Sequence, residues 1–238
     1  IRFNSGVSSS SVFVSCLKDK VDLTLALLKD ALFEPRFDAE DFKRIKNQVI
    51  ENLKTQKRNP SIMARKAWGS IMFEGTILEN YYYGDYKSLS KIGLDDVKSF
   101  YSKFYSPNVS TLVISGDISQ SEAMGKLGFF KEWKNTNVTI PSIPELAMPE
   151  STTIYLVDKP YDAQSTIYIG HPGPKYDFNG EYFKAGVMNF SLGGAFNSRI
   201  NLNLREDKGY TYGARTGFSG SDQYGVFRFS SEIKKEAT

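Results

Sequence analysis

Arg205 and Tyr212, seven positions apart, are the two side chains of this sequence best suited to hold a polarised carbonyl group. Arginine presents a rigid fork of N–H donors, tyrosine presents one O–H, and neither titrates near neutral pH. Such a pair can bind a peptide carbonyl, or the oxyanion that forms from it during hydrolysis. A plainer alternative is that the helix dipole favours an arginine in the last turn and that Tyr212 is an ordinary strand residue. The residues alone favour this plainer alternative.

Few side chains of the sequence suit metal or nucleophilic catalysis. A hydrolytic zinc site normally needs three ligands from His, Cys, Asp or Glu, but the chain has one histidine, His171, and one cysteine, Cys16. Neither H-E-x-x-H nor H-x-x-E-H occurs, and the G-x-S-x-G of a serine hydrolase is also absent. We expect His171 to be structural and Cys16 to be buried. The sequence therefore predicts no metal or other cofactor bound by these residues.

A helix end and a strand start are predicted to position the pair. The helix expected at 195–205 has a buried stripe, formed by Phe196, Ile200 and Leu204. Arg205 lies about 140° from the centre of that stripe, so it should point away from the core. Lys208-Gly209 ends the helix, and strands are expected near 211–218 and 224–232. One edge of the fold should thus present both side chains.

The rest of the chain reads as helices and strands in blocks. Alternating apolar and polar residues predict strands at 11–17, 110–116, 152–158 and 164–170. Helical periodicity predicts helices at 21–32, 38–58, 60–71 and 97–104, one ending at Trp133, and one at 178–191. Asp38 and Asn59-Pro60 supply helix starts. We expect an α+β fold, with helices packed on a mainly antiparallel sheet.

Charge and hydropathy argue against nucleic-acid binding and against a membrane-spanning segment. The 30 basic and 27 acidic residues give a net charge of +3 and are dispersed, so no nucleic-acid partner is expected. No apolar run approaches the roughly 20 residues of a membrane span. The first residues, IRFNSG, and the last, SSEIKKEAT, lead us to expect that the chain is cut from a longer polypeptide. The sequence leaves its compartment open.

The run LGGAFNSRINLNLREDKGYTY, at 192–212, resembles the second-domain signature of pitrilysin/insulinase zinc peptidases. RIKNQVIENL and DDVKSFYSKFYSPNVSTLVISGDI resemble the close of a first domain in that family. The resemblance implies that Arg205 and Tyr212 grip the substrate. It also implies two similar processing-peptidase-like α+β domains, both incomplete here. They are the C-terminal part of a first domain at 1–133, a linker at 134–150, and the N-terminal part of a second domain at 151–238.

The resemblance also bears on the lack of zinc ligands in this sequence. Counting back from Asn59-Pro60, the position of the family's zinc-binding glutamate falls on Asn52, whose amide is a poor zinc ligand. Glu51 is one position off and lies on the far face of its helix. We therefore expect the substrate-clamping, metal-free portion of a zinc metalloendopeptidase that cleaves unfolded peptides, inactive by itself. Its partners would be a peptide substrate and a zinc-bearing unit, in the same chain or in a second subunit. The alternative is a non-catalytic structural or peptide-binding subunit of the same fold.

Overall fold

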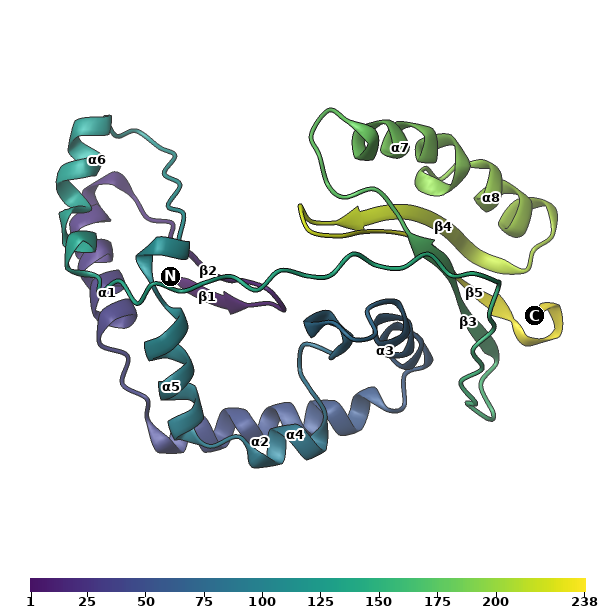
Figure 1. Ribbon diagram of the computed structural model, residues 1–238, viewed down its shortest axis with the longest axis horizontal. Coiled ribbons are helices and arrows are strands. Elements are labelled where there is room, and N and C mark those ends of the chain that lie inside the picture. The colour runs from purple at the N-terminus through teal and green to yellow at the C-terminus, as the bar shows by residue number, and fades with distance from the viewer. The chain divides into compact units, whose positions relative to one another are not determined.

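The computed structural model describes all residues, 1–238, and shows an α+β protein of helices and antiparallel sheets (Figure 1). The predicted fold class is confirmed. Contacts group the chain into two compact units, Ile1–Ile50 with Gly84–Pro141 and Glu51–Tyr83 with Ser142–Thr238. We describe each unit by itself.

The first unit is mostly helical. Strands β1 (Arg2–Ser5) and β2 (Ser10–Phe13) form a short antiparallel pair. Its helices are α1 (Val21–Phe33), the first part of α2 (Ala39–Gln56), α4 (Tyr86–Lys91), α5 (Leu94–Phe104) and α6 (Gln120–Lys126). As predicted, Asp38 begins α2, because its carboxylate accepts the Asp41 N–H at 2.8 Å.

Aromatic side chains close the core of the first unit. Leu28 and Leu32 of α1 are buried, and the ring of Phe33 packs on the rings of Phe129, Phe130 and Trp133. The Tyr101 hydroxyl of α5 donates to the carbonyl of Leu32, and burial raises the pKa of this tyrosine. Aromatic packing therefore joins α1 to residues 129–133, and a partly buried hydrogen bond joins it to α5.

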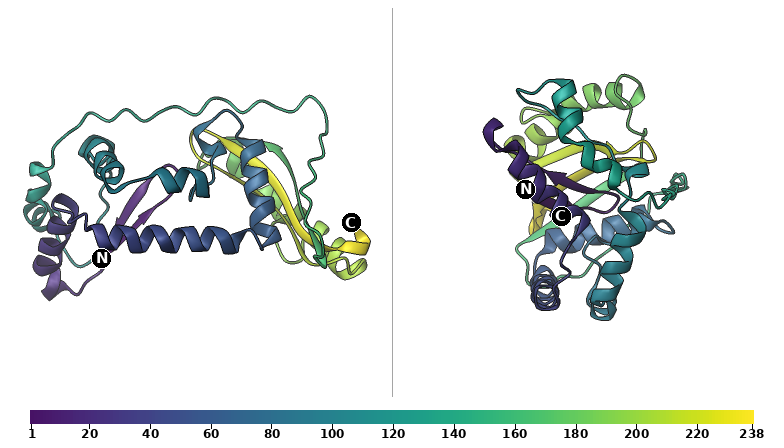
Figure 2. Two further views of the ribbon diagram at one scale, coloured as in Figure 1. Left: turned by 90° about the horizontal axis from the view of Figure 1, so that it is seen from below. Right: turned by 90° about the vertical axis from the view of Figure 1, so that its left-hand side faces the viewer.

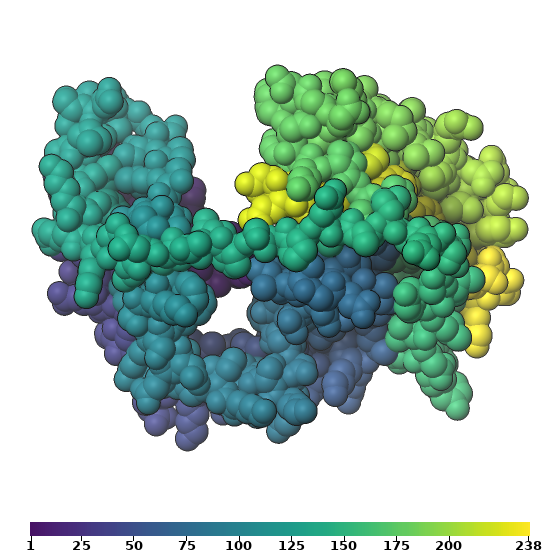
Figure 3. All heavy atoms as spheres, in the orientation of Figure 1, coloured from purple at the N-terminus to yellow at the C-terminus, as the bar shows by residue number.

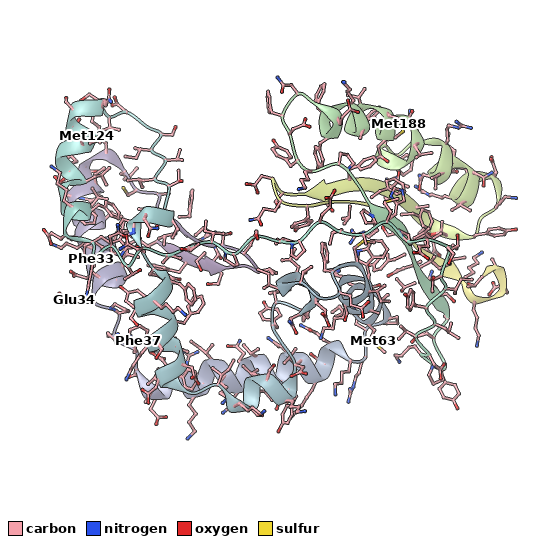
Figure 4. All side chains as sticks on the ribbon, in the orientation of Figure 1. Phe33, Glu34, Phe37, Met63, Met124 and Met188 are labelled. Atoms are coloured by element: carbon pink, nitrogen blue, oxygen red, sulfur yellow. The ribbon has the colours of Figure 1, made fainter.

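The second unit is a three-stranded antiparallel sheet between two helical layers. Its order is β3–β5–β4, formed by Gln164–Pro172, Gly225–Lys234 and Thr211–Gly220. Helices α7 (Glu181–Asn189) and α8 (Arg199–Asn201) pack on one face, and α3 (Pro60–Met72) covers the other (Figure 2). Met188 on α7 and Met63 on α3 mark the two layers (Figure 4). Asn59 caps α3 as predicted, since its side chain accepts the Ile62 N–H.

Strand alternation separates the two faces of this sheet. Ala214, Thr216 and Ile233 point into the buried layer under α7 and α8. Tyr168, Ser230 and Arg215 share one cross-strand row on the opposite, polar face. In Figure 3 the green atoms of the α7 region lie against the yellow tip of the β4–β5 hairpin. The polar face, with α3 above it, is where the candidate site begins.

Two predicted strands are absent. Residues 110–116 and 152–158 pair with no other strand, and their apolar side chains are open to solvent: Val113 is 84% exposed, Ile154 88% and Leu156 92%. A strand needs a neighbour for its backbone groups, and neither sheet supplies one. The helix expected to reach Trp133 ends at Lys126 and continues as a 3₁₀ turn, Gly128–Glu132. Cys16, predicted to be buried, is exposed.

Helix α3 and the C-terminal sheet belong to one compact unit, although α3 precedes the proline-rich segment 134–150. The expected domain boundary at that segment stays a prediction. No helix of the structure has both the length and the hydropathy to cross a membrane.

Candidate functional site

Arg205 lies in a widened helical turn. The helix expected at 195–205 begins only at Arg199, and after Asn201 it continues as a π-helical turn, Leu202–Asp207. The Lys208 N–H donates to the Asn203 carbonyl five residues back, at 3.1 Å. Gly209 ends the turn with a φ of 62°, a conformation that glycine adopts without a steric penalty. Such widened turns are common where a helix presents a functional side chain.

The aromatic ring of Phe196 contacts two guanidinium groups. Arg205 lies 4.5 Å and Arg215 5.8 Å from the ring centroid. Phe196 was predicted to be buried, but its side chain is 58% exposed, because the chain is not yet helical at 195–198. Cation–π contact restrains each guanidinium and leaves the N–H groups that have no other partner available to bind a ligand.

Asn201 links two elements: the helix that precedes Arg205 and the strand that carries Tyr212. Its side chain is fully buried, donates to the Phe196 carbonyl at 2.6 Å and accepts the Ala214 N–H at 2.9 Å. The expected stripe is only partly formed, since Ile200 and Leu204 are half-buried. The sequence gives no sign of this role for Asn201, because a polar side chain on a helix is usually solvated.

A β-bulge places Tyr212 and Arg215 on the same face of the sheet. In the β4–β5 register Thr211 lies opposite Ile233 and Ala214 opposite Ser231, so β4 holds one extra residue. Thr211 and Ala214 are both buried, whereas Tyr212, 88% exposed, and Arg215 both face outward. Without the extra residue these two side chains would alternate to opposite faces.

An open pocket of about 350 Å³ adjoins Tyr212. It lies between α3 and the polar face of the sheet, and its charged lining residues are Arg65, Arg215 and Glu232. The Ser61 hydroxyl donates to the Glu232 carboxylate. Arg215 donates to the Ala195 carbonyl at 3.0 Å, which fixes the direction of its guanidinium.

Arg205 and Tyr212 lie at the helix end and the strand start, as the spacing predicts. No hydrogen bond joins them. Arg205 and Tyr212 are linked only indirectly. Arg205 and Arg215 both contact the Phe196 ring, and Arg215 lines the pocket together with Tyr212. Arg205 Nε also lies 3.3 Å from a carboxylate oxygen of Glu206. The Tyr212 hydroxyl has no partner and is free to donate.

No group of three or more His, Cys, Asp or Glu side chains is placed to hold a metal ion. Asn52 is exposed on α2, and the neighbouring Glu51 forms an ion pair with Lys54 at 2.7 Å. The ring of His171 stacks on Phe227, and its Nδ1 lies 2.6 Å from the Pro172 carbonyl. These contacts give the histidine a structural role.

Residues 91–238, which include this whole helix, bulge and hairpin, match the family model described as the peptidase M16 inactive domain. The chain belongs to the peptidase M16 family. The relationship predicted from the 192–212 motif is thereby confirmed. The matched M16 domain is the inactive one, so the chain is a non-catalytic member of the M16 fold.

Relatives agree with the M16 assignment. The chain is 25% identical over 228 residues to a Helicobacter pylori protein named non-peptidase homolog YmxG, covering 92% of this chain and 51% of that protein. It is 24% identical over 217 residues to an uncharacterized zinc protease YmxG of Bacillus subtilis, covering 90% and 51%. The chain thus spans about half the length of these relatives.

The M16 fold also agrees with a crystal structure. A peptidase M16 inactive domain from Pseudomonas fluorescens superposes with a TM-score of 0.84 at 26% identity. The match covers 92% of this chain and 53% of that one. The arrangement of helices and antiparallel strands is therefore shared with an M16 structure.

Proposed function

We propose that this chain is the substrate-holding, metal-free unit of an M16 endopeptidase that cleaves unfolded peptides. Arg205 and Tyr212 bind the carbonyl of the bond to be cleaved, and a zinc-bearing unit, in the same chain or in a second subunit, performs the hydrolysis. The observation that supports this proposal best is the pair of accessible donors at the helix end and the strand start: Arg205, whose guanidinium lies on the Phe196 ring, and Tyr212, whose side chain is open to solvent.

The geometry suits binding of a carbonyl. The guanidinium of Arg205 rests on the Phe196 ring, so its orientation is restricted while its terminal N–H groups stay available. The Tyr212 hydroxyl is free and stands on a strand whose bulge is fixed by buried hydrogen bonds. Donors held in place before the reaction stabilise the developing oxyanion more than mobile ones do.

The described residues do not fit a zinc ion, since Asn52 offers only an amide and Glu51 is engaged by Lys54. We therefore assign the metal chemistry to the partner unit and binding of the peptide to this one.

Replacement of Tyr212 by Phe in the complete enzyme tests this role. The change removes one hydroxyl from an exposed side chain, so we expect turnover of an unfolded peptide to fall about 10- to 100-fold without loss of folding. Tyr210→Phe is the matched control, because its hydroxyl also lacks a partner in this unit. Equal turnover by both variants would refute the clamp.

The second candidate function is a non-catalytic structural or peptide-binding subunit of the same fold. The Helicobacter pylori relative, which is named a non-peptidase homolog, favours it. Metal analysis distinguishes the two candidates: zinc in any unit of the purified complete protein supports the peptidase, and its absence from every unit supports the scaffold.

A further inference from the structure

The pocket beside Tyr212 carries a net positive charge, and its two arginines have no carboxylate partner. Two guanidinium groups, Arg65 and Arg215, line it with one carboxylate, Glu232, which leaves one net positive charge. Neither arginine forms an ion pair. A third arginine on the same sheet face, Arg228, rests on the Tyr168 ring at 5.1 Å and is also unpaired.

We propose that this pocket is a specificity subsite that binds an acidic side chain, Glu or Asp, of the peptide held by Arg205 and Tyr212. The proposal rests on the proposed function, because it places the pocket next to the clamped carbonyl. Arg215 makes the principal contact with the carboxylate, and Arg65 of α3 adds a second charge from across the pocket.

The β-bulge gives the subsite its position. Because the extra residue turns Tyr212 and Arg215 to the same face, two neighbouring groups of a bound extended peptide can meet them together. One group is the peptide carbonyl at Tyr212, and the other is a side chain that enters the pocket. The pocket volume of about 350 Å³ is at the lower end of ligand sites and suits a single side chain with bound water.

Arg215 is held ready to bind a carboxylate. One terminal nitrogen donates to Ala195, and the Phe196 ring lies against the guanidinium. A fork restrained in this way loses little freedom when a carboxylate accepts its remaining N–H groups. The hydroxyl-bearing residues Thr166, Tyr168 and Ser230 add polar groups to the wall.

Glu232 limits the charge of the pocket without neutralising Arg215. It stands on β5 opposite Thr166, one row away from the Tyr168–Ser230–Arg215 row, and its carboxylate accepts from Ser61. An incoming acidic side chain is attracted by two arginines and repelled by one glutamate. Removal of this glutamate should therefore strengthen the preference for acidic peptides.

The test is a glutamate scan of the substrate. A fluorescent, neutral, unfolded peptide is compared with versions that place Glu or Gln at each position in turn. Binding to the complete protein is measured by anisotropy after zinc is chelated to prevent cleavage. We expect one position at which the peptide with Glu binds about three- to tenfold more tightly than the peptide with Gln. This difference in affinity should shrink as salt is added.

Three variants assign the effect to the pocket. Arg65→Gln, which alters an exposed side chain that forms no hydrogen bond or ion pair, should reduce the Glu advantage without changing stability. Arg215→Gln should abolish it, whereas Arg215→Lys, which keeps the charge but not the fork, should retain part of it. Glu232→Gln should enlarge the advantage.

The subsite is refuted if no position prefers Glu, or if the preference persists in both Arg65→Gln and Arg215→Gln. Failure of the proposed function looks different, since the neutral parent peptide would then be turned over by the wild-type enzyme and by Tyr212→Phe at equal rates. A Tyr212-dependent turnover without any Glu preference would therefore reject the subsite and leave the clamp intact.

Discussion

At the scale of single residues, Asn201 is the side chain on which the geometry of the site depends. Its own amide is closed to water and satisfies two backbone groups from different elements, the partly buried Phe196 carbonyl and the buried Ala214 N–H. Both groups would be left without partners if the amide were removed. A buried unpaired donor or acceptor costs about 1–3 kcal/mol.

Asn201→Ala should therefore lower the free energy of unfolding by about 2–4 kcal/mol. It should also speed the hydrogen exchange of the Ala214 amide, which loses its acceptor. Asn203→Ala is the control, because its exposed side chain forms no hydrogen bond, and we expect a change within about 0.5 kcal/mol. Equal effects of the two substitutions in denaturant unfolding would contradict this role.

The sequence predicted Arg205 and Tyr212 because a specific motif lies around them, and both residues occupy the helix end and strand start that it indicates. Arg215 and Asn201 were not predicted. The orientation of Arg215 depends on a bulge, which shifts the alternation of a strand by one residue and leaves no reliable local signal. The contacts of Asn201 are tertiary, so no periodicity reveals them.

At the scale of elements, the close approach of Gly193 to β4 sets the packing of the helical layer. A Cβ at Gly193 would lie 2.1 Å from the Thr216 hydroxyl oxygen and 2.7 Å from the Thr216 nitrogen. The neighbouring Asn189 exchanges hydrogen bonds with Thr216, one of them at 2.6 Å. The π-helical turn Phe190–Gly194 thus sits directly on the strand.

Gly193→Ala should destabilise the protein by roughly 1–3 kcal/mol, because the methyl group forces the turn away from Thr216. Gly186→Ala in α7 is the opposite case, since its added Cβ meets no atom within 4 Å. It should be neutral or stabilising by up to about 1 kcal/mol. Denaturation midpoints that move in the same direction for both variants would contradict this packing.

Helices α1 and α3 and the two hairpin strands were predicted closely, because capping residues and periodicity are local. Helix α3 starts at the expected Asn59-Pro60, and α1 ends within a residue or two of the expected position. Segments 110–116 and 152–158 have the composition of strands but no partner to pair with. Strand formation depends on a neighbour, which the segment itself cannot indicate.

At the scale of the whole molecule, these unpaired segments leave apolar side chains open to solvent, with Ile154 and Leu156 both near 90% exposed. Apolar surface of this kind recruits hydrophobic dyes and promotes association. We expect residues 1–238, expressed alone, to bind 8-anilinonaphthalene-1-sulfonate and to self-associate. The double variant Ile154→Lys with Leu156→Lys should bind less dye. A monomeric wild-type chain without dye binding would contradict this expectation.

In the complete enzyme, we propose, this M16 unit holds the peptide and a zinc-bearing unit hydrolyses it. The most direct test is kcat/KM for an unfolded peptide in the complete enzyme with Arg205→Gln, Tyr212→Phe and both changes together. We predict that each single change lowers kcat/KM and that the double variant loses less than the two losses multiplied, because both donors act on one oxygen. Single variants with the kcat/KM of the wild-type enzyme would contradict the account.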